Sequence, residues 1–266
     1  MAVTTPFQTL FAVPMHCDGC AKDITSALHK LPGITKVEAN VKDQLVSIEG
    51  TEAPSAIVEA IKATGRDAIL RGSGTSNSAA VSILETYHHR PTDAEVTPAN
   101  APGESWVNQR LVRGLVRMVQ VSPTETLVDL TVRGVPPGTY HATVREYGDL
   151  KDGAASAGPV WSGAPGSREG GDGQPRGVLG TVHVGPNGYG NAFINRPFQV
   201  WEVIGHALVV SRRDESDGEP LRNEEDTVLG VIARSAGVWD NDKTVCSCTG
   251  KTLWQERKDE VSKGML

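Results

Sequence analysis

A change in hydrophobic pattern at residues 72–78 is the feature that most constrains how this chain can fold. Before this segment, strand-like stretches alternate with helical patterns, whereas after it the apolar residues recur at every second position. The segment itself, Gly-Ser-Gly-Thr-Ser-Asn-Ser, has the composition of a flexible linker. We therefore expect a first domain over residues 1–71, the linker over 72–78, a second domain over 79–236 and a tail over 237–266. The linker would leave the first domain free to move relative to the second.

The first domain has the pattern of a split βαβ fold. Its first helix is indicated by Ala21, Ile24 and Leu28, which recur at helical spacing. The elements follow one another as βαββαβ, which is the α+β, ferredoxin-like arrangement. The expected strands are 7–13, 35–41, 45–48 and 68–70, and the expected helices are 20–31 and one that Pro54 begins and Gly65 ends.

Cys17 and Cys20 stand in the turn between the first strand and the first helix. Unpaired N–H groups and the helix dipole favour a thiolate at this end of a helix, and thiolates bind soft metal ions such as Cu(I) or Zn(II). Two sulfurs without further donors suit a low-coordinate Cu(I) ion best. The alternative is a thioredoxin-like redox pair, but such pairs usually have Trp before the first cysteine and Gly-Pro between the two. We expect Met15 to be a core side chain that shapes the loop, and His16 to be solvated.

The string Met15-His-Cys-Asp-Gly-Cys20, with the elements around it, resembles the heavy-metal-associated domain of copper chaperones and copper ATPases. This resemblance implies that Cys17 and Cys20 bind Cu(I). It also places Arg66 in the loop that faces the metal pair in that family, where a cation would offset the negative charge of a Cu(I)–dithiolate. The alternative is that Arg66 is a solvated surface residue.

Short strands separated by Gly- and Pro-containing turns fill the second domain. The chain has 29 glycines and only 5% aromatic residues, which suits turn-rich β structure. This pattern predicts a sandwich or a barrel. Residues 88–105 and 152–177 are rich in Pro, Gly or polar residues, and we expect long loops there. The expected strands are 81–83, 115–121, 127–132, 140–147, 179–184, 207–211 and 228–233.

Several strings in the second domain resemble copper/zinc superoxide dismutase. They are Arg145-Glu-Tyr-Gly-Asp149, Ser156-Ala-Gly-Pro159, Ile204-Gly205 followed by Leu208-Val-Val210, and Gly230-Val-Ile232. The resemblance implies an all-β Greek-key barrel that dimerises edge to edge. A dismutase subunit, giving a heterodimer, or a second copy of this chain would dock on the same face. The resemblance assigns to that face Tyr147, Gly148, Asp149, Ile204, Gly205, Val231, Ile232 and Ala233.

The residues that carry the chemistry of that enzyme family are replaced in this chain. Dismutation needs a redox copper ion held by imidazoles, so we expect a barrel that has kept its shape and lost its catalyst. The protein is therefore expected not to be an enzyme. The substitutions are Thr143 and Arg145 for a His-x-His motif, Val160 and Ser211 for histidines, Leu229 for the disulfide cysteine and Asp226 for the arginine that guides substrate.

Cys246 and Cys248 form a CxC motif in the tail and are the only cysteines besides Cys17 and Cys20. In an extended strand, residues i and i+2 point the same way, so both thiols can face one metal ion or one partner. A disulfide between them would close a small, strained ring and would be reactive. This suits a transient carrier of metal or of oxidising equivalents. We also expect a short helix that begins near Thr252.

The order of these parts resembles the family of copper chaperones for superoxide dismutase, and the lost ligands and disulfide resemble its fungal branch. The resemblance implies that Cys17 and Cys20 acquire Cu(I) and that the barrel docks an immature dismutase subunit. Cys246 and Cys248 would then pass on copper and exchange with the target thiols, so that the target disulfide forms. Which cysteine pair makes the final delivery stays open. The alternatives are a structural zinc protein that uses all four cysteines, and an active dismutase with a fused metal domain.

Charge and composition narrow the partners and the compartment. The net charge of −6 offers no basic patch for nucleic acid. No apolar run approaches the roughly 18 to 20 residues of a membrane span, and the N-terminus has no apolar signal core. Cysteines in close pairs without a secretion signal indicate a reducing compartment. We therefore expect a cytoplasmic protein, with a mitochondrial intermembrane-space pool as a further location that no targeting segment supports.

Overall fold

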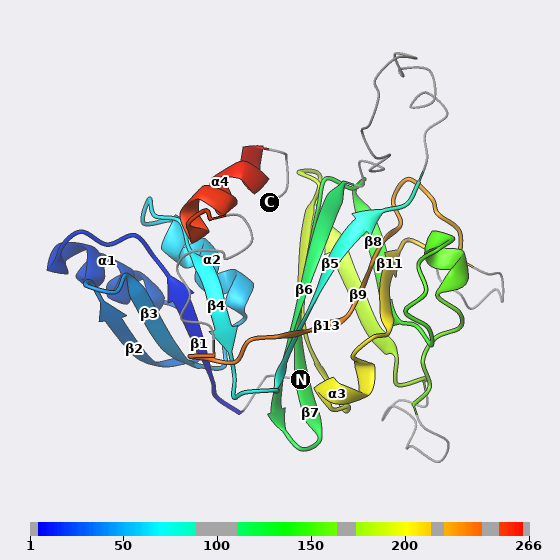
Figure 1. The fold of residues 1–266 in the computed structure, drawn as a ribbon, viewed down its shortest axis with the longest axis horizontal. Coiled ribbons are helices and arrows are strands. Elements are labelled where there is room, and N and C mark those ends of the chain that lie inside the picture. Colours follow the sequence, from blue (N-terminus) through cyan, green and yellow to red (C-terminus); the bar gives the residue numbers. More distant parts are fainter. Residues whose placement is uncertain (1–4, 89–110, 164–173, 214–220, 241–249, 263–266) are drawn as a thin grey trace.

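The computed structural model describes residues 5–88, 111–163, 174–213, 221–240 and 250–262. Its first part is an antiparallel sheet in the order β2-β3-β1-β4, with two helices between the strands. This is the expected ferredoxin-like fold, and Figure 1 shows it beside the barrel that follows. Its elements are β1 (Phe7–Ala12), α1 (Asp18–Leu28), β2 (Ile34–Asn40), β3 (Leu45–Gly50), α2 (Pro54–Lys62) and β4 (Ile69–Ser73).

Both helices of this domain bury an apolar stripe. Ile24 and Leu28 on α1, and Ile57 and Ile61 on α2, are four residues apart and therefore lie on one face of their helix. All four side chains belong to one core with Phe11 of β1. The helices thus cover the sheet at the positions that the helical spacing indicated.

The second part is a near-closed all-β barrel, which confirms the expected fold class. Its strands follow the order β10-β7-β6-β5-β12-β11-β8-β9, and β13 also pairs with β5. Two pairs of neighbours, β7 with β10 and β8 with β11, are not consecutive in sequence, so the chain makes the long crossover connections of a Greek key. The strands are β5 (Ala79–Thr86), β6 (Val112–Ser122), β7 (Glu125–Arg133), β8 (Gly138–Val144), β9 (Val178–Val184), β10 (Tyr189–Arg196), β11 (Ala207–Ser211), β12 (Val228–Val231) and β13 (Ala233–Ser235).

Three elements of this part were not predicted. Strand β10 has only one fully buried residue, Gly190, so its sequence lacks a period of two. Helix α3 (Val200–Val203) is a single turn. The 3-10 helix η2 (Gly153–Ser156) lies within the stretch 152–177 that we expected to be a loop, so that expectation is corrected for these four residues. Most of the other expected loop, 88–105, lies outside the described residues.

The two domains pack against each other. Phe7, on β1, forms an apolar cluster with Val119 and Leu127 of the barrel. The hydroxyl of Tyr189, on β10, donates to Glu59 of α2 over 2.7 Å. The first domain is therefore docked on the barrel through β1 and α2.

The segment 72–78, expected as a flexible linker, is hydrogen-bonded in this structure. Gly72 and Ser73 are the last residues of β4, and the N–H of Gly74 donates to the carbonyl of Gln8 over 2.8 Å. A Cβ on Gly72 would lie 2.1 Å from the carbonyl oxygen of Gly237, so only glycine permits this close approach of the returning chain. Tertiary hydrogen bonds thus hold a sequence whose composition is that of a free chain, and its flexibility stays a prediction.

Helix α4 (Leu253–Ser262) lies within the tail and begins close to Thr252, as expected. Figure 1 shows α4, in red, next to α2 of the first domain. Of the helices that the structure describes, none has the length and the apolar composition of a membrane-spanning segment.

Candidate metal-binding site

Cys17 and Cys20 lie together at the N-terminus of α1. Their Sγ atoms are 3.6 Å apart, and both residues are free thiols. Cys17 is the N-cap residue in an extended conformation, and the N–H of Cys20 donates to its carbonyl over 3.0 Å. Cys17 is exposed and Cys20 is half-buried, so an incoming ion or a partner thiolate can reach the pair.

The loop before the pair is held by the core of the first domain. The side chain of Met15 is 1% exposed and belongs to the same core as Ile24 and Phe11. His16 is exposed, as expected. The buried side chain of Met15 therefore anchors the loop to the core, while the two thiols lie at the surface.

Cys20 is poised as a thiolate. Its pKa is lowered from 9.0 to about 6, first by the hydrogen bond from the backbone of His16, then by the side chain of Arg66 and that of Cys17. The small desolvation of Cys20 acts in the opposite direction and is outweighed. At neutral pH this thiol is therefore mostly ionised, which is the form that binds a soft metal ion.

Arg66 faces the thiol pair from the loop between α2 and β4. The Cys20 side chain is the largest cause that raises the pKa of the Arg66 guanidinium. Arg66 also contacts Asp23 of α1 at 3.3 Å and donates to the carbonyl of Thr64 over 3.0 Å. These contacts hold the guanidinium beside the Cys20 thiolate, whose negative charge it offsets.

Cys246 and Cys248 lie outside the described residues, but the chain on either side of them is anchored. Before them, Asp240 accepts hydrogen bonds from the hydroxyl of Ser76 and from the N–H of Gly237. After them, Arg257 on α4 donates from Nε to the carboxylate of Asp67 over 3.2 Å. Burial alone would raise the pKa of Asp67, but the hydrogen bonds from Arg257 and the N–H of Ala68 lower it. The chain before the CxC motif is therefore held by Ser76 of the segment 72–78, and the chain after the motif is held by Asp67 of the first domain.

The barrel positions that differ from a dismutase are filled by side chains of other chemistry. Arg145, at a position where the resemblance predicts an imidazole, is 2% exposed and donates from Nε to the carbonyl of Gly158 over 2.9 Å. Ser211 and Leu229 are also buried. Within the described part of the chain, no group of three or more His, Cys, Asp or Glu side chains is arranged to hold a metal ion.

The three segments expected on the dimer face are adjacent in the barrel. The carbonyl of Tyr147 accepts from the N–H of Ala207 over 3.1 Å, and the N–H of Gly205 donates to the carbonyl of Ile232 over 2.9 Å. Gly148 lies against Gly205 so closely that a Cβ on Gly148 would come within 1.9 Å of its carbonyl oxygen. The segments around Tyr147, Gly205 and Ile232 therefore form one continuous surface.

The side chains on that surface differ in exposure. Tyr147 is 56% exposed and Val231 is 39% exposed, whereas Ile232 is only 1% exposed and belongs to the barrel core. Ile204 is half-buried against the same core, and Asp149, Gly205 and Ala233 are exposed. Of the expected face, Ile232 can therefore contribute only its backbone, because alternate residues of a strand point to opposite sides.

Two exposed apolar side chains of the barrel were not predicted as surface features. Ile83, on β5, is 52% exposed, and its carbonyl lies against Gly230, next to Val231. Trp201, on α3, is 61% exposed and donates from its indole N–H to the side chain of Gln199 over 2.8 Å. The sequence around a single apolar residue in a strand or turn does not show whether its side chain faces the core or the solvent. The exposure of Ile83 and Trp201 is therefore known only from the packed barrel.

Comparison with known proteins matches both domains. The heavy-metal-associated domain family matches residues 9–67, and the copper/zinc superoxide dismutase family matches residues 112–233. The "Superoxide dismutase 1 copper chaperone" of Saccharomyces cerevisiae is 39% identical over 265 residues, which cover 98% of either chain. The protein of the same description from Kluyveromyces lactis is 42% identical and covers 96% of this chain and 94% of its own. The human "Copper chaperone for superoxide dismutase" is 33% identical and covers 93% of this chain and 88% of its own.

Proposed function

The chain belongs to the family of copper chaperones for superoxide dismutase, and from this membership we propose that it carries copper on Cys17 and Cys20 and loads it into a copper/zinc superoxide dismutase subunit. The observation that carries the metal site is the pair of thiols 3.6 Å apart at the N-terminus of α1. One of them, Cys20, has its pKa lowered to about 6. Cys20 is therefore available as a thiolate ligand at neutral pH.

The cargo is Cu(I). Two thiolates are soft ligands, and a low-coordinate d10 ion leaves room for a third sulfur from a donor or an acceptor. Copper can therefore move from thiolate to thiolate through shared-ligand intermediates and is never released to water. Arg66 supports this role, because its cation offsets the charge of the dithiolate before and during exchange. This chemistry fits the reducing conditions of the cytoplasm, where we expect the protein to act.

The barrel docks the target. Backbone hydrogen bonds join Tyr147 to Ala207 and Gly205 to Ile232 on its expected face, which exposes the apolar side chains of Tyr147 and Val231. An immature dismutase subunit would bind there to form a heterodimer, and a homodimer would use the same face in the absence of the target. Only one of these pairings can exist at a time, so target binding would compete with self-association.

The tail cysteines act on the docked target. Cys246 and Cys248 receive copper or carry a disulfide, which exchanges with two target thiols. In that exchange the target loses two electrons and gains its disulfide, while the CxC pair returns to the dithiol form. Dioxygen is the oxidant that restores the CxC disulfide in the experiment below. The anchored flanks of the tail, at Asp240 and Arg257, support delivery close to the first domain.

Single-turnover activation tests this function. The Cu(I)-loaded protein is mixed under air with reduced, copper-free dismutase and a copper chelator, and dismutase activity is assayed. We expect activity with the wild type, and loss of activity with Cys17→Ser/Cys20→Ser and with Cys246→Ser/Cys248→Ser. His16→Ala is the matched control, because it removes only an exposed side chain next to Cys17 and keeps the backbone of His16 that bonds to Cys20.

The results separate the roles of the two cysteine pairs. If the tail variant delivers copper but leaves the target disulfide unformed, the tail acts in thiol exchange alone. If the wild type holds copper tightly and activates no dismutase, the proposed function is wrong. One tightly bound Zn(II) per chain and no Cu(I) would instead favour a structural zinc protein.

A further inference from the structure

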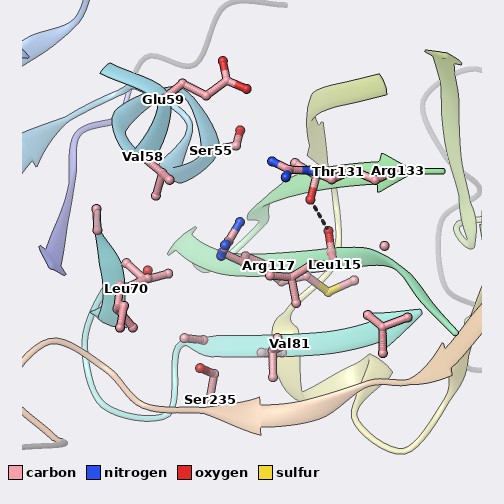
Figure 2. A pocket seen from close by; sticks show the side chains of 18 of the residues that line it. Ser55, Val58, Glu59, Leu70, Val81, Leu115, Arg117, Thr131, Arg133 and Ser235 are labelled. Atoms are coloured by element: carbon pink, nitrogen blue, oxygen red, sulfur yellow. Dashed lines mark hydrogen bonds between the residues drawn. The ribbon is translucent and has the colours of Figure 1, made fainter. Parts of the chain in front are cut away.

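A cavity of about 340 Å³ lies between the first domain and the barrel. Its walls come from α2 and β4 on one side and from β5, β6 and β7 on the other, and Arg257 of α4 borders it. Figure 2 shows Arg117 and Arg133 extending from β6 and β7 toward α2, with Leu70 on a neighbouring wall. Cavities of this size at a domain boundary are common sites for small ligands.

The lining of this cavity is strongly cationic. Among the described residues, five basic side chains and one carboxylate, that of Glu59, line it. This is a local concentration of positive charge in a chain whose net charge is −6. The five basic residues are Lys62, Arg113, Arg117, Arg133 and Arg257.

Three of these cations lack a balancing carboxylate. Arg117 pairs with Asp129, and Arg257 pairs with Asp67. Lys62, Arg113 and Arg133 form no ion pair with a carboxylate among the described residues, and Arg133 instead lies 5.1 Å from the centre of the Tyr189 ring. Glu59 accepts a hydrogen bond from the hydroxyl of Tyr189, and the carboxylates of Asp67 and Glu59 both lie close enough to Lys62 to act on its charge.

Positive charges act on one another within the cavity. Burial is the largest cause that lowers the pKa of Lys62, and the charge of Arg257 lowers it further; Asp67, Arg133 and Glu59 have smaller effects, in which the two carboxylates raise it and Arg133 lowers it. An anion bound between these side chains would raise the pKa of Lys62, because its negative charge offsets the neighbouring positive charges.

A buried hydroxyl provides a second, independent observation. Ser73 lines the same cavity and is 4% exposed. Its Oγ has no hydrogen-bond partner within the described part of the chain. Buried polar groups normally have a partner, so an unpaired hydroxyl in the wall of a cavity indicates a ligand or a water molecule that occupies it.

We propose that this cavity is a binding site for a small polyanion that carries phosphate groups, held by Lys62, Arg113 and Arg133 with Ser73 as a further hydrogen-bond donor. The cations come from α2, β6 and β7, so they approach an anion from several directions. This arrangement suits the tetrahedral, multiply charged phosphate group better than a single planar carboxylate. The apolar side chains of Val58, Leu70 and Leu115 in the lining leave room for the organic part of a phosphate ester.

Such a ligand would bridge the two domains. Lys62 belongs to the first domain, whereas Arg113 and Arg133 belong to the barrel. The bound anion would therefore strengthen the docked arrangement, because it binds only when both walls are present. This role is separate from copper binding, because the cavity contains neither Cys17 nor Cys20.

Calorimetric titration of the full-length, copper-free protein with inorganic pyrophosphate tests this site, at constant ionic strength and with the thiols kept reduced. A second titration with ADP distinguishes a free diphosphate from a phosphate ester. We expect one site per chain, and at least about tenfold weaker binding by Lys62→Gln and by Arg133→Gln, since each loses a charge-assisted contact. Lys36→Gln is the matched control, because Lys36 is an exposed lysine on β2 that pairs with Glu38 and changes the net charge equally.

Ser73→Ala is a variant that should fold as the wild type does, because it removes a hydroxyl that has no hydrogen-bond partner among the described residues. We expect weaker pyrophosphate binding with an unchanged melting temperature of the ligand-free protein. Pyrophosphate should also raise the melting temperature of the wild type and fail to do so for Lys62→Gln. Absence of binding, or binding that Lys62→Gln and Arg133→Gln do not weaken more than Lys36→Gln does, would overturn the proposal.

Discussion

Ser55, the second residue of α2, donates both its backbone N–H and its hydroxyl to the carboxylate of Asp129 on β7, over 2.9 and 2.7 Å. The first turn of a helix has N–H groups without a partner inside the helix, and a carboxylate satisfies them well. Here the carboxylate belongs to the barrel, so one domain caps a helix of the other. Asp129 is 2% exposed and also pairs with Arg117 at 3.4 Å.

Asp129→Ala is expected to destabilise the protein by about 3–5 kcal/mol, because it removes the acceptor of both buried donors of Ser55 and leaves the half-buried Arg117 without its carboxylate. Desolvation raises the pKa of Asp129 and lowers that of Arg117, which shows how little water reaches this pair. Urea unfolding followed by circular dichroism measures the effect.

The double variant Asp129→Ala/Arg117→Met is the control for this change. Since it removes both charges, it should recover part of the stability that Asp129→Ala loses. A loss below about 1 kcal/mol for Asp129→Ala would mean that water or another group replaces the carboxylate.

Alkylation of Cys20 by iodoacetamide is expected to show a midpoint somewhat above pH 6 and well below pH 9, in the copper-free protein with Cys17→Ser, Cys246→Ser and Cys248→Ser. The pKa of Cys20 is lowered to about 6 from 9.0, so the thiolate is present above pH 6 and is lost as the pH falls through that value. Removing Cys17 takes away one of the smaller causes and should move the midpoint somewhat upward from that of the intact pair. Mass spectrometry of quenched samples gives the rate at each pH.

Arg66→Met should shift that midpoint to higher pH, because the Arg66 side chain is the second largest cause of the lowered pKa. Lys22→Met, which removes a cation from the exposed side of α1, serves as the comparison. An equal shift in both variants would mean that the general field of the protein, and not the contact with Arg66, sets the reactivity of Cys20.

Asp67→Arg is expected to loosen α4 from the first domain, because it replaces the ion pair with Arg257 by a repulsion. The pair is partly exposed, with Asp67 at 38%, so a contribution of about 0.5–1 kcal/mol and a few-fold faster amide exchange in α4 are expected. Hydrogen exchange measured by mass spectrometry reports on α4 directly. The charge-reversed double variant Asp67→Arg/Arg257→Asp should restore slow exchange; if it does not, the contact between these two residues is not what holds α4.

Val231→Glu is expected to weaken docking of a dismutase subunit by at least about tenfold, because it would place an unpaired charge in an apolar interface. Val231 is 39% exposed, so the substitution should not disturb the barrel core. Sedimentation velocity of the mixture, at several concentrations, measures the heterodimer.

Leu111→Glu provides the counterpart for that measurement, since Leu111 is 48% exposed and lies outside the expected face. Equal weakening by both substitutions would place the docking surface elsewhere. If the homodimer uses the same face, Val231→Glu should also weaken self-association more than Leu111→Glu does.

Much of the first domain was predictable because its information is local. Ile24 and Leu28, or Ile57 and Ile61, report the buried face of their helix by spacing alone. Cys17 and Cys20 were placed at a helix N-terminus for the same reason, since a strand pattern and a helix pattern meet there. By contrast, β10 was missed because its residues do not alternate between a buried and an exposed side.

Residue type and spacing within one element were enough to predict the two domains, their order and the thiol pair, and the resemblance to the dismutase family implied that its ligands are lost. The position of Asp129 beneath α2, the hydrogen bonds along residues 72–78 and the gathering of five basic side chains around one cavity are visible only in the folded structure. These features arise where two surfaces with separate patterns come into contact. From sequence alone, a polar residue in a strand is predicted to face solvent. When a second domain covers it, the free energy of its burial depends on hydrogen-bond partners that are distant in sequence.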